Sequence, residues 1–367
     1  MSFGTFFLPG PTEVRPEVLQ AMTRPMIPHR GAAFESLFAR ITEQLKLVFR
    51  TERPVYVSSS SATGFMEGAV RCAPPGPVLA LVNGAFSERF ARIAVACGRD
   101  TDRIAVPLGA TFDLAQVRAA LESKAYAAVT VVHSETSTGV LTDVAAVTAL
   151  ACAHGAFCLV DSVTGIGAAP LEFDAWEMDF VLTGSQKALA LPPGLAFAAV
   201  SERYLARVGE APARGVYFDL LEFDAFARKH QTPNTPALPL LYALDAQLAA
   251  IAAESIEVRW ARHAAMRAAT EQWVDGALQR TGFDLRMLAL PGMRSPTVST
   301  IALPPEVPAK RLVAAVADQG YVIGSGYGAL AGTTVRIGHM GDHTLETLAG
   351  CLAACDRALA AMGGGGA

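Results

Sequence analysis

Short apolar runs that alternate with stretches of helical spacing constrain the fold of this chain more than any other feature. The runs are rich in Val, Leu and Ala, and their length and β-branched content are typical of buried strands. They lie at 54–57, 77–82, 127–132, 156–160, 180–182 and 196–200. Strands that alternate with helices predict an α/β fold, in which a mostly parallel, mixed sheet is covered by helices on both faces.

Helical spacing of apolar residues fills the segments between these runs. The pattern predicts helices from residue 15 onward and over 34–49, 65–72, 88–97, 114–121 and 143–154. Residues 1–16 are rich in Pro and Gly, so we expect an extended N-terminal segment on the surface.

The pattern changes in the last third of the chain. Residues 239–281 have helical spacing throughout, which predicts one long helix or two that bridge to a second domain. The next segments predict strand, helix, strand, strand and helix at 298–303, 310–319, 321–323, 334–337 and 344–361. We therefore expect a large domain over 17–245, a small α+β domain over 246–362 and a disordered tail at 363–367.

Composition excludes several classes of function. The net charge is −4, which gives no electrostatic attraction to nucleic acid or an anionic membrane. Charged residues, Gly or Pro interrupt every long apolar run, so we expect no membrane span, and the N-terminus is too proline-broken for a secretory signal. The six cysteines have neither C-x-x-C nor zinc-site spacing, which predicts a cytoplasmic protein without disulfides or a metal site.

Lys187 is the first candidate for chemistry. It is the only charged residue between Val181 and Val200, and the whole chain has only five lysines. An ammonium in apolar surroundings costs free energy, and desolvation lowers its pKa, which is the condition for Schiff-base chemistry. The alternative is a lysine that extends its ammonium from a strand end into solvent. Lys187 alone leaves both interpretations open.

Asp161 closes the apolar strand of AFCLVDSVTGIG. Open α/β sheets bind ligands at the carboxyl ends of their strands. In enzymes that use pyridoxal 5′-phosphate (PLP), a carboxylate in this place pairs with the ring nitrogen, which lets the ring accept electrons from the substrate. The alternative role for Asp161 is to cap the following turn.

The SSSSATG segment follows a predicted strand and precedes a predicted helix. Hydroxyl groups and backbone N–H groups at a helix start bind anions. The segment lacks both the P-loop and the dinucleotide glycine pattern, so it predicts a site for a single phosphate or, alternatively, a serine-rich turn.

Two further residues occupy suggestive positions. Phe86 directly follows a predicted buried strand, where an aromatic ring either stacks on a planar cofactor or fills the core. Arg336 interrupts an apolar strand of the second domain. Its guanidinium suits a substrate carboxylate, or it faces solvent from an edge strand. Lys187, Asp161, the upstream SSSSATG segment and Arg336 together are the parts that PLP chemistry needs.

Six motifs carry a resemblance to a known family, in the order LPGPTEV, HSETSTGV, LVDSVTGIG, GSQKALALPPG, TPNTPA and VRIGHMGD. Across nearly its whole length the chain resembles the PLP-dependent class V aminotransferases of fold type I. Within them it is most similar to the alanine–glyoxylate and serine–glyoxylate (serine–pyruvate) branch. GSQKAL followed by PPG is the most specific of these motifs.

The resemblance implies a role for each matching residue. Lys187 holds PLP as a Schiff base and moves the substrate proton, and Asp161 pairs with the ring nitrogen. Phe86 stacks on the ring, and Arg336 binds the substrate carboxylate. Ser61, Ala62, Thr63 and Gln186 bind the phosphate, and Thr136 lies near the ring's phenolic oxygen. Thr235 and Thr232 reach the phosphate that is bound in the partner subunit.

The resemblance also implies an activity. It is a ping-pong transfer of the amino group of alanine or serine to glyoxylate or another small 2-oxo acid, in a homodimer with shared active sites. The chain departs from its relatives at Ala62, where a glycine is common, and at Phe86, where a tryptophan is common. Neither change removes a reacting group.

The sequence also bears on several alternative functions. A cysteine desulfurase needs a nucleophilic cysteine downstream of the lysine, but no cysteine lies between Cys158 and Cys351. An aminotransferase for 2-aminoethylphosphonate, ureidoglycine or aspartate stays open, with Arg30 as the one candidate for a second anion-binding group. A non-catalytic PLP-fold module is disfavoured because Lys187, Asp161 and Arg336 are all present.

Overall fold

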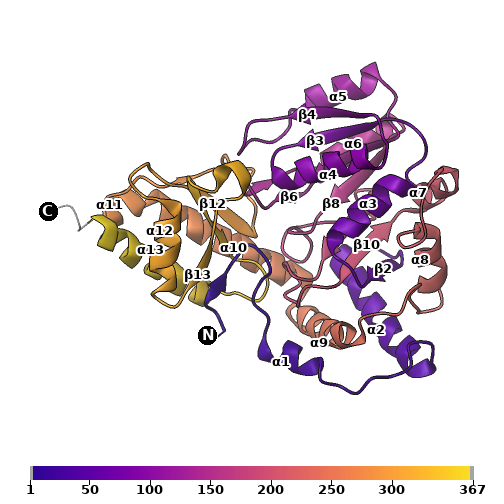
Figure 1. Cartoon of the computed structure of the whole chain (residues 1–367), viewed down its shortest axis with the longest axis horizontal. Helices are drawn as coiled ribbons and strands as arrows, with labels where there is room; N and C mark the ends of the chain where they lie inside the picture. The colour runs from indigo at the N-terminus through magenta and orange to yellow at the C-terminus, as the bar shows by residue number, and fades with distance from the viewer. Residues whose placement is uncertain (1–2, 364–367) are drawn as a thin grey trace.

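A seven-stranded mixed sheet forms the centre of the larger part of the molecule, with the strand order β2-β10-β9-β8-β5-β3-β4 (Figure 1). The structure is a computed structural model and describes residues 3–363. Six of these strands match predicted apolar runs, whereas β4 was not predicted because it is a polar edge strand. The strands are β2 (Val55–Ser58), β3 (Val78–Val82), β4 (Thr101–Ala105), β5 (Ala128–Val132), β8 (Phe157–Asp161), β9 (Phe180–Gly184) and β10 (Ala196–Val200).

The strands β4, β3, β5, β8 and β9 pair in parallel, and β10 is antiparallel to both β9 and β2. The expectation of a mostly parallel mixed sheet is therefore confirmed. In this register Asp161 at the end of β8 lies between Val132 of β5 and Leu182 of β9. The carboxyl end of β5 lies near the second part of the molecule, since Thr136, shortly after β5, lies within 3.4 Å of Arg336.

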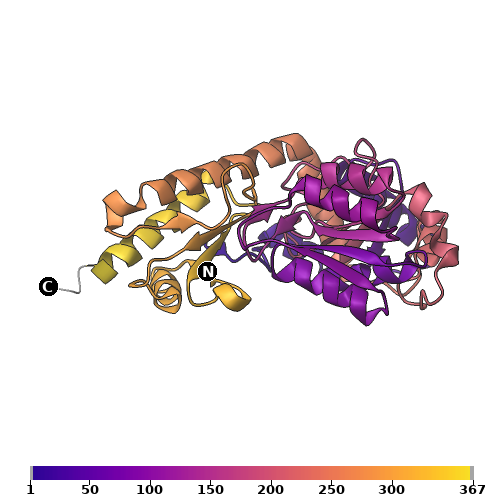
Figure 2. The ribbon, with the colours of Figure 1, turned by 90° about the horizontal axis from the view of Figure 1, so that it is seen from above.

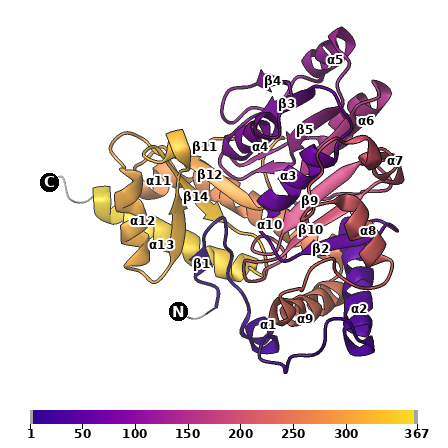
Figure 3. The same cartoon turned by 45° about the vertical axis from the view of Figure 1, so that its right-hand side comes forward.

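Helices cover both faces of the sheet, as the alternating pattern predicted (Figures 1 and 3). Helix α2 shows how the sequence specifies them: Phe34, Phe38, Ile41 and Leu45 recur at helical spacing and are all buried. The helices of this part are α1 (Pro16–Ala21), α2 (Ala32–Phe49), α3 (Ala62–Cys72), α4 (Ala85–Ala96), α5 (Leu114–Ser123), α6 (Val144–Ala153), α7 (Glu202–Leu205), α8 (Leu220–Ala227) and α9 (Leu238–Glu254).

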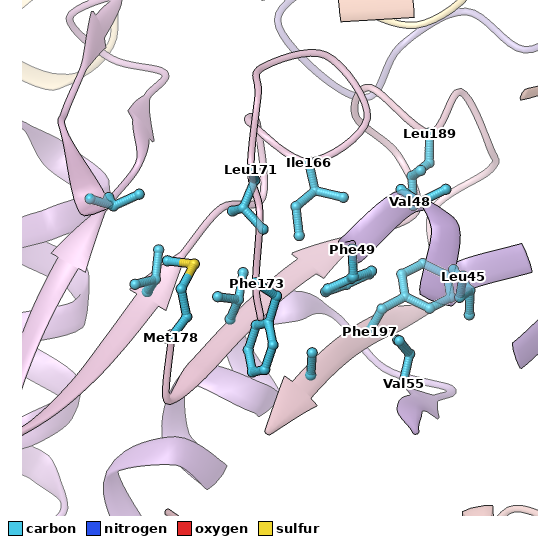
Figure 4. Packing of buried hydrophobic residues seen from close by; sticks show 14 of the residues in the cluster. Leu45, Val48, Phe49, Val55, Ile166, Leu171, Phe173, Met178, Leu189 and Phe197 are labelled. Carbon is cyan, nitrogen blue, oxygen red and sulfur yellow. The ribbon is translucent and has the colours of Figure 1, made fainter. Parts of the chain in front are cut away.

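Each face of the sheet has its own apolar core. On one face α2 packs its side chains, among them Phe49, against residues such as Phe197 of β10 and Phe173 (Figure 4). On the other face α3, α4 and α8 cover a second cluster that includes Phe65 and Leu182. Two buried faces explain why the strands are apolar along their whole length.

A second, five-stranded sheet has the order β1-β13-β14-β12-β11. The helices α10, α11, α12 and α13 pack with it, α10 and α12 directly on its strands. Its strands are β1 (Phe6–Phe7), β11 (Arg286–Met287), β12 (Val298–Ala302), β13 (Val322–Ser325) and β14 (Thr334–Gly338), and its helices are α10 (Ile256–Asp275), α11 (Ala277–Thr281), α12 (Ala309–Ala317) and α13 (Leu345–Gly363).

The prediction for the N-terminal segment was partly wrong. The segment is extended, but β1 pairs in parallel with β13, and Phe7 is 0% exposed in the core of the second sheet. Residues 1–2 lie outside the described part of the chain. At the other end Gly363 still belongs to α13, and the rest of the predicted tail, 364–367, also lies outside it.

The long helical segment consists of two main helices rather than one. Ser255 has φ +67°, which ends α9, and its hydroxyl accepts the N–H of Val258 to cap α10. Helix α10 then runs along the second sheet (Figure 2). Within residues 3–363 there is no helix that combines the length and apolarity needed to cross a membrane.

Candidate active site

A cavity of about 330 Å³ lies at the carboxyl ends of the central strands. These strands flank the point where the strand order reverses, which is where open α/β sheets bind ligands. The cavity brings together eight of the predicted residues, which come from five separate segments: Ser61, Ala62, Thr63, Phe86, Thr136, Asp161, Gln186 and Lys187.

Lys187 lies in the turn that follows β9, and it is 8% exposed. Its Nζ atom donates a hydrogen bond to the carbonyl oxygen of Pro9 at 2.5 Å. Burial, followed by the charge of Arg336, lowers the pKa of Lys187 to about 8, although the carboxylate of Asp161 opposes the shift. A neutral amine is therefore accessible near neutral pH, as Schiff-base chemistry requires.

The N-terminal segment forms one wall of the cavity through Gly10 and Pro11. Gly10 has φ +109°, and a Cβ atom there would overlap the side chain of Lys187. Glycine at this position therefore allows the backbone to approach the lysine closely.

Asp161 ends β8 and is 3% exposed. Its Oδ1 atom accepts the N–H of Val163 at 2.8 Å. Burial raises the pKa of Asp161 to about 7, and the hydrogen bond from Val163 opposes this shift. A carboxylate in this environment is stabilised by a cationic partner, such as a protonated ring nitrogen.

The start of helix α3 also lines the cavity, through Ser61, Ala62 and Thr63. Ser61 is the N-cap, and within residues 3–363 its hydroxyl makes no capping hydrogen bond, which leaves the N–H groups of Ala62 and Thr63 available to an anion. The next N–H group, that of Gly64, donates to the Ser61 carbonyl at 3.0 Å. Ala62 lies within the right-handed helix, so the absence of the relatives' glycine causes no backbone strain. Gln186 also lines this cavity.

Phe86 lies in the first turn of α4, and its ring centroid lies 6.0 Å from Nζ of Lys187. The ring stacks on Tyr327 of the second sheet's β13–β14 loop, with centroids 5.4 Å apart. The Thr136 hydroxyl lies 2.5 Å from that of Thr164, another lining residue.

Arg336 lies on β14 and does not line the cavity itself. Its Nε atom donates to the carbonyl of Ser325 at 2.9 Å, and Nη1 lies 3.4 Å from the carbonyl of Thr136. The guanidinium has no carboxylate partner within residues 3–363. The charge of Arg336 also lowers the pKa of Lys187. Both observations place Arg336 at the side of the cavity that faces the second sheet.

The structure does not bring Thr232 and Thr235 to the cavity of their own chain. They line a separate hollow together with Ser58, Ser59 and Tyr217. Arg30, the candidate for a second anion-binding group, instead donates to the carbonyl of Thr232. It is therefore not part of the cavity.

Sequence reasoning missed several residues at the site. Arg89 lines the cavity one turn after Phe86 on α4, and its Nη2 atom donates to the Tyr327 hydroxyl at 3.3 Å. Its i+3 spacing from Phe86 was the available signal. Glu135, which immediately precedes Thr136, was also missed. A single sequence does not show that this carboxylate is buried or which groups donate hydrogen bonds to it.

The cysteines do not support a desulfurase. No cysteine lines the cavity, and Cys351 and Cys355 are buried in the core formed by α13. Among the residues that the structure describes, no group of three or more Cys, His, Asp or Glu side chains is arranged to hold a metal.

The chemistry of the lining fits PLP. A buried amine is available for the aldehyde, a buried carboxylate for the ring nitrogen, an aromatic ring for the pyridine face and a helix start for the phosphate. Burial shifts the pKa values of Lys187 and Asp161 in the directions that favour their neutral forms. A ligand with complementary charges would therefore stabilise the site.

Comparison with known proteins agrees with this interpretation. Residues 79–326 match the family model for class V aminotransferases. The chain is 33% identical to a serine–glyoxylate aminotransferase of Methylorubrum extorquens, covering 96% of this chain and 90% of that protein. It is 31% identical to an L-aspartate–glyoxylate aminotransferase of Paracoccus denitrificans, covering 97% and 91%.

The fold also matches a solved structure. Alanine–glyoxylate aminotransferase from Nostoc sp. superposes with a TM-score of 0.90 at 30% identity, covering 97% of this chain and 95% of that one. The chain therefore belongs to the class V aminotransferases, which depend on pyridoxal 5′-phosphate.

Proposed function

We propose that this aminotransferase moves the amino group of a small amino acid, alanine or serine, to glyoxylate or another small 2-oxo acid. The observation that carries the proposal is the placement of Lys187 and Asp161 in one cavity, with Arg336 next to it. PLP supplies the electron-accepting ring when it is bound.

The chain's own residues have distinct tasks in this proposal. Lys187 holds the cofactor and, when released from it, carries the proton to and from the substrate Cα atom. Asp161 keeps the ring nitrogen protonated. Arg336 orients the substrate through its carboxylate, since its guanidinium is free of acidic partners in the described chain.

The serine–glyoxylate and alanine–glyoxylate relatives support a small donor, and the cavity volume of about 330 Å³ must also hold the cofactor. Aspartate is the second candidate donor. It is favoured by the L-aspartate–glyoxylate relative and by Arg89, a second guanidinium that lines the cavity.

We further propose that two copies of the chain form a homodimer in the cytoplasm. Thr232 and Thr235 line a hollow outside the cavity, so a phosphate contact from either one has to serve the partner's site. The six thiols are unpaired, which fits a reducing compartment.

The test is a panel of amino donors, namely alanine, serine, aspartate, glutamate and 2-aminoethylphosphonate, each paired with glyoxylate, pyruvate or 2-oxoglutarate. The PLP-loaded enzyme should show its highest kcat/KM with alanine or serine and glyoxylate. A clear preference for aspartate would overturn the choice of donor, and no amino transfer with any pair would overturn the proposed function.

A further inference from the structure

The side chain of Glu135 is 0% exposed and lies between two segments that reach the cavity. It belongs to β6 (Ser134–Glu135), a short strand that follows β5 and pairs with β7 (Val140–Leu141). A buried carboxylate of this kind costs free energy unless donors surround it. Five donor groups do so, and they come from two residues of helix α4 and from Ser137.

The first set of donors belongs to the start of helix α4. The N–H groups of Phe86 and Ser87 lie 3.1 and 2.9 Å from Oε2 of Glu135, and the Ser87 hydroxyl lies 3.1 Å from the same atom. The carboxylate thus binds the free N–H groups of the helix's first turn from outside the helix. A negative charge at this end also interacts favourably with the helix dipole.

The second set of donors comes from the segment that carries Thr136. The N–H and hydroxyl of Ser137 lie 3.1 and 2.6 Å from Oε1 of Glu135. The Ser137 hydroxyl also accepts the N–H of Ala85, the first residue of α4, at 2.9 Å. The two segments are therefore joined twice, directly by Glu135 and through Ser137.

The packing leaves little freedom for this connection. Gly84 precedes α4, and a Cβ atom there would overlap the side chains of Glu135 and Ser137. The backbone before Phe86 can therefore approach the carboxylate only because this residue is glycine. Phe86 and Thr136 follow directly from these fixed backbones, and both line the cavity.

We infer that Glu135 is a positioning residue of the cofactor site: its carboxylate fixes the Phe86 ring and the Thr136 hydroxyl relative to each other, and so sets the slot that receives the PLP ring. Glu135 is not among the residues that line the cavity. The inference rests on the proposed roles of Phe86 and Thr136 as cofactor contacts.

The charge of Glu135 has a separate effect. The charged groups that influence Lys187 are Arg336, Asp161, Arg89 and Glu135, and the two carboxylates counteract the lowering of its pKa. Removal of the Glu135 charge should therefore lower the pKa of Lys187 further. A role limited to stability does not predict this change.

The test compares Glu135→Gln with Glu88→Gln. Glu88 lies on the same helix, but its carboxylate pairs with Arg103 near the surface at 2.8 Å. Glutamine at 135 keeps the shape but directs an amide N–H₂ group at N–H donors. We expect the Kd for PLP, measured by absorbance or fluorescence titration, to rise roughly 10- to 100-fold in Glu135→Gln and to stay within about twofold of wild type in Glu88→Gln.

Two further readouts separate positioning from stability. In Glu135→Gln the near-visible circular dichroism of bound PLP should change, and the acid limb of the PLP uptake rate should move to lower pH. Ser137→Ala removes one donor without removing the charge, and should weaken PLP binding without moving the acid limb. It also keeps the test possible if Glu135→Gln fails to fold.

A Glu135→Gln protein with a lower Tm but wild-type PLP affinity, dichroism and pH profile would overturn the inference. Phe86→Ala and Thr136→Ala serve as references. If they too leave PLP binding unchanged, the proposed cofactor contacts are wrong; if they weaken it while Glu135→Gln does not, only the role of Glu135 is wrong.

Discussion

Lys187 and Asp161 carry opposite charges in one cavity, yet burial shifts both toward their neutral forms. The pKa of Lys187 falls to about 8, and the pKa of Asp161 rises to about 7. Desolvation thus outweighs the attraction between the two groups. PLP held by Lys187, with its ring nitrogen at Asp161, would offset the cost of burying both groups.

The first prediction concerns the pH dependence of PLP uptake by the PLP-free protein. Only the neutral amine of Lys187 reacts with the aldehyde, so uptake should be near its maximum above pH 8 and slow about tenfold for each pH unit below it. Stopped-flow absorbance measures this rate. An acid limb near pH 10 would show a fully solvated lysine and contradict the burial argument.

The second prediction concerns Asp161→Asn, which should have opposite effects on turnover and stability. Loss of the charge that stabilises the ring should lower kcat by about 100-fold or more. Because the pKa of Asp161 is raised from 3.8 to about 7, the PLP-free protein loses stability as pH rises through this window. At pH 8 the variant should therefore unfold at a Tm about 2 °C or more above wild type.

Asp179→Asn is the matched control for stability. Asp179 is equally buried, but it binds the guanidinium of Arg203 and the N–H of Cys158. This substitution should lower Tm because it leaves Arg203 without its charged partner. Equal losses of Tm in Asp161→Asn and Asp179→Asn would contradict the account of Asp161.

The third prediction concerns Arg336→Gln. Loss of a charge-assisted hydrogen bond to the substrate carboxylate should raise KM for the amino donor roughly 10- to 100-fold. PLP affinity should fall only as far as a higher pKa of Lys187 reduces the fraction of neutral amine, since Arg336 does not line the cofactor cavity. Arg286→Gln on β11, the edge strand of the same sheet, where the arginine is exposed, should change neither quantity. A lower PLP affinity with unchanged KM would assign Arg336 to the cofactor instead.

The fourth prediction tests whether Thr235 completes the partner's site. Lys187→Ala and Thr235→Ala proteins should each be inactive at low PLP concentration, one for lack of the amine and the other for weak phosphate binding. Mixed and re-equilibrated, they should recover activity from about a quarter of the wild-type sites, because each heterodimer contains one intact site. No recovery in a mixture shown to contain heterodimers would contradict the shared site.

The central sheet could be predicted from sequence because its strands are buried on both faces and therefore apolar throughout. The polar edge strand β4 gave no such signal. The pairing of β1 with β13 was also out of reach, since two residues carry no periodicity and their partner lies more than 300 residues away. Ser255, which separates α9 from α10, acts through a positive φ that the surrounding helical pattern conceals.

The candidate site was predictable where a motif carries the chemistry, as for Lys187 and Asp161. Glu135 and the Pro9 carbonyl were not, because their roles arise from contacts between segments distant in sequence. Arg89 had only its i+3 spacing from Phe86 as a signal, and its contact with Tyr327 also joins distant segments. Ala62 stands where the resemblance implies a glycine, but the position lies in the first turn of helix α3, where alanine is well suited.

The most direct test of the central claim is borohydride reduction of the PLP-loaded protein, followed by proteolysis and mass spectrometry. The near-visible absorbance should disappear, and one stoichiometric pyridoxyl-phosphate adduct should be found on the peptide that contains Lys187. Lys187→Ala protein, treated in the same way, should carry none. An adduct on another lysine, or full turnover by Lys187→Ala, would contradict the claim that Lys187 holds the cofactor.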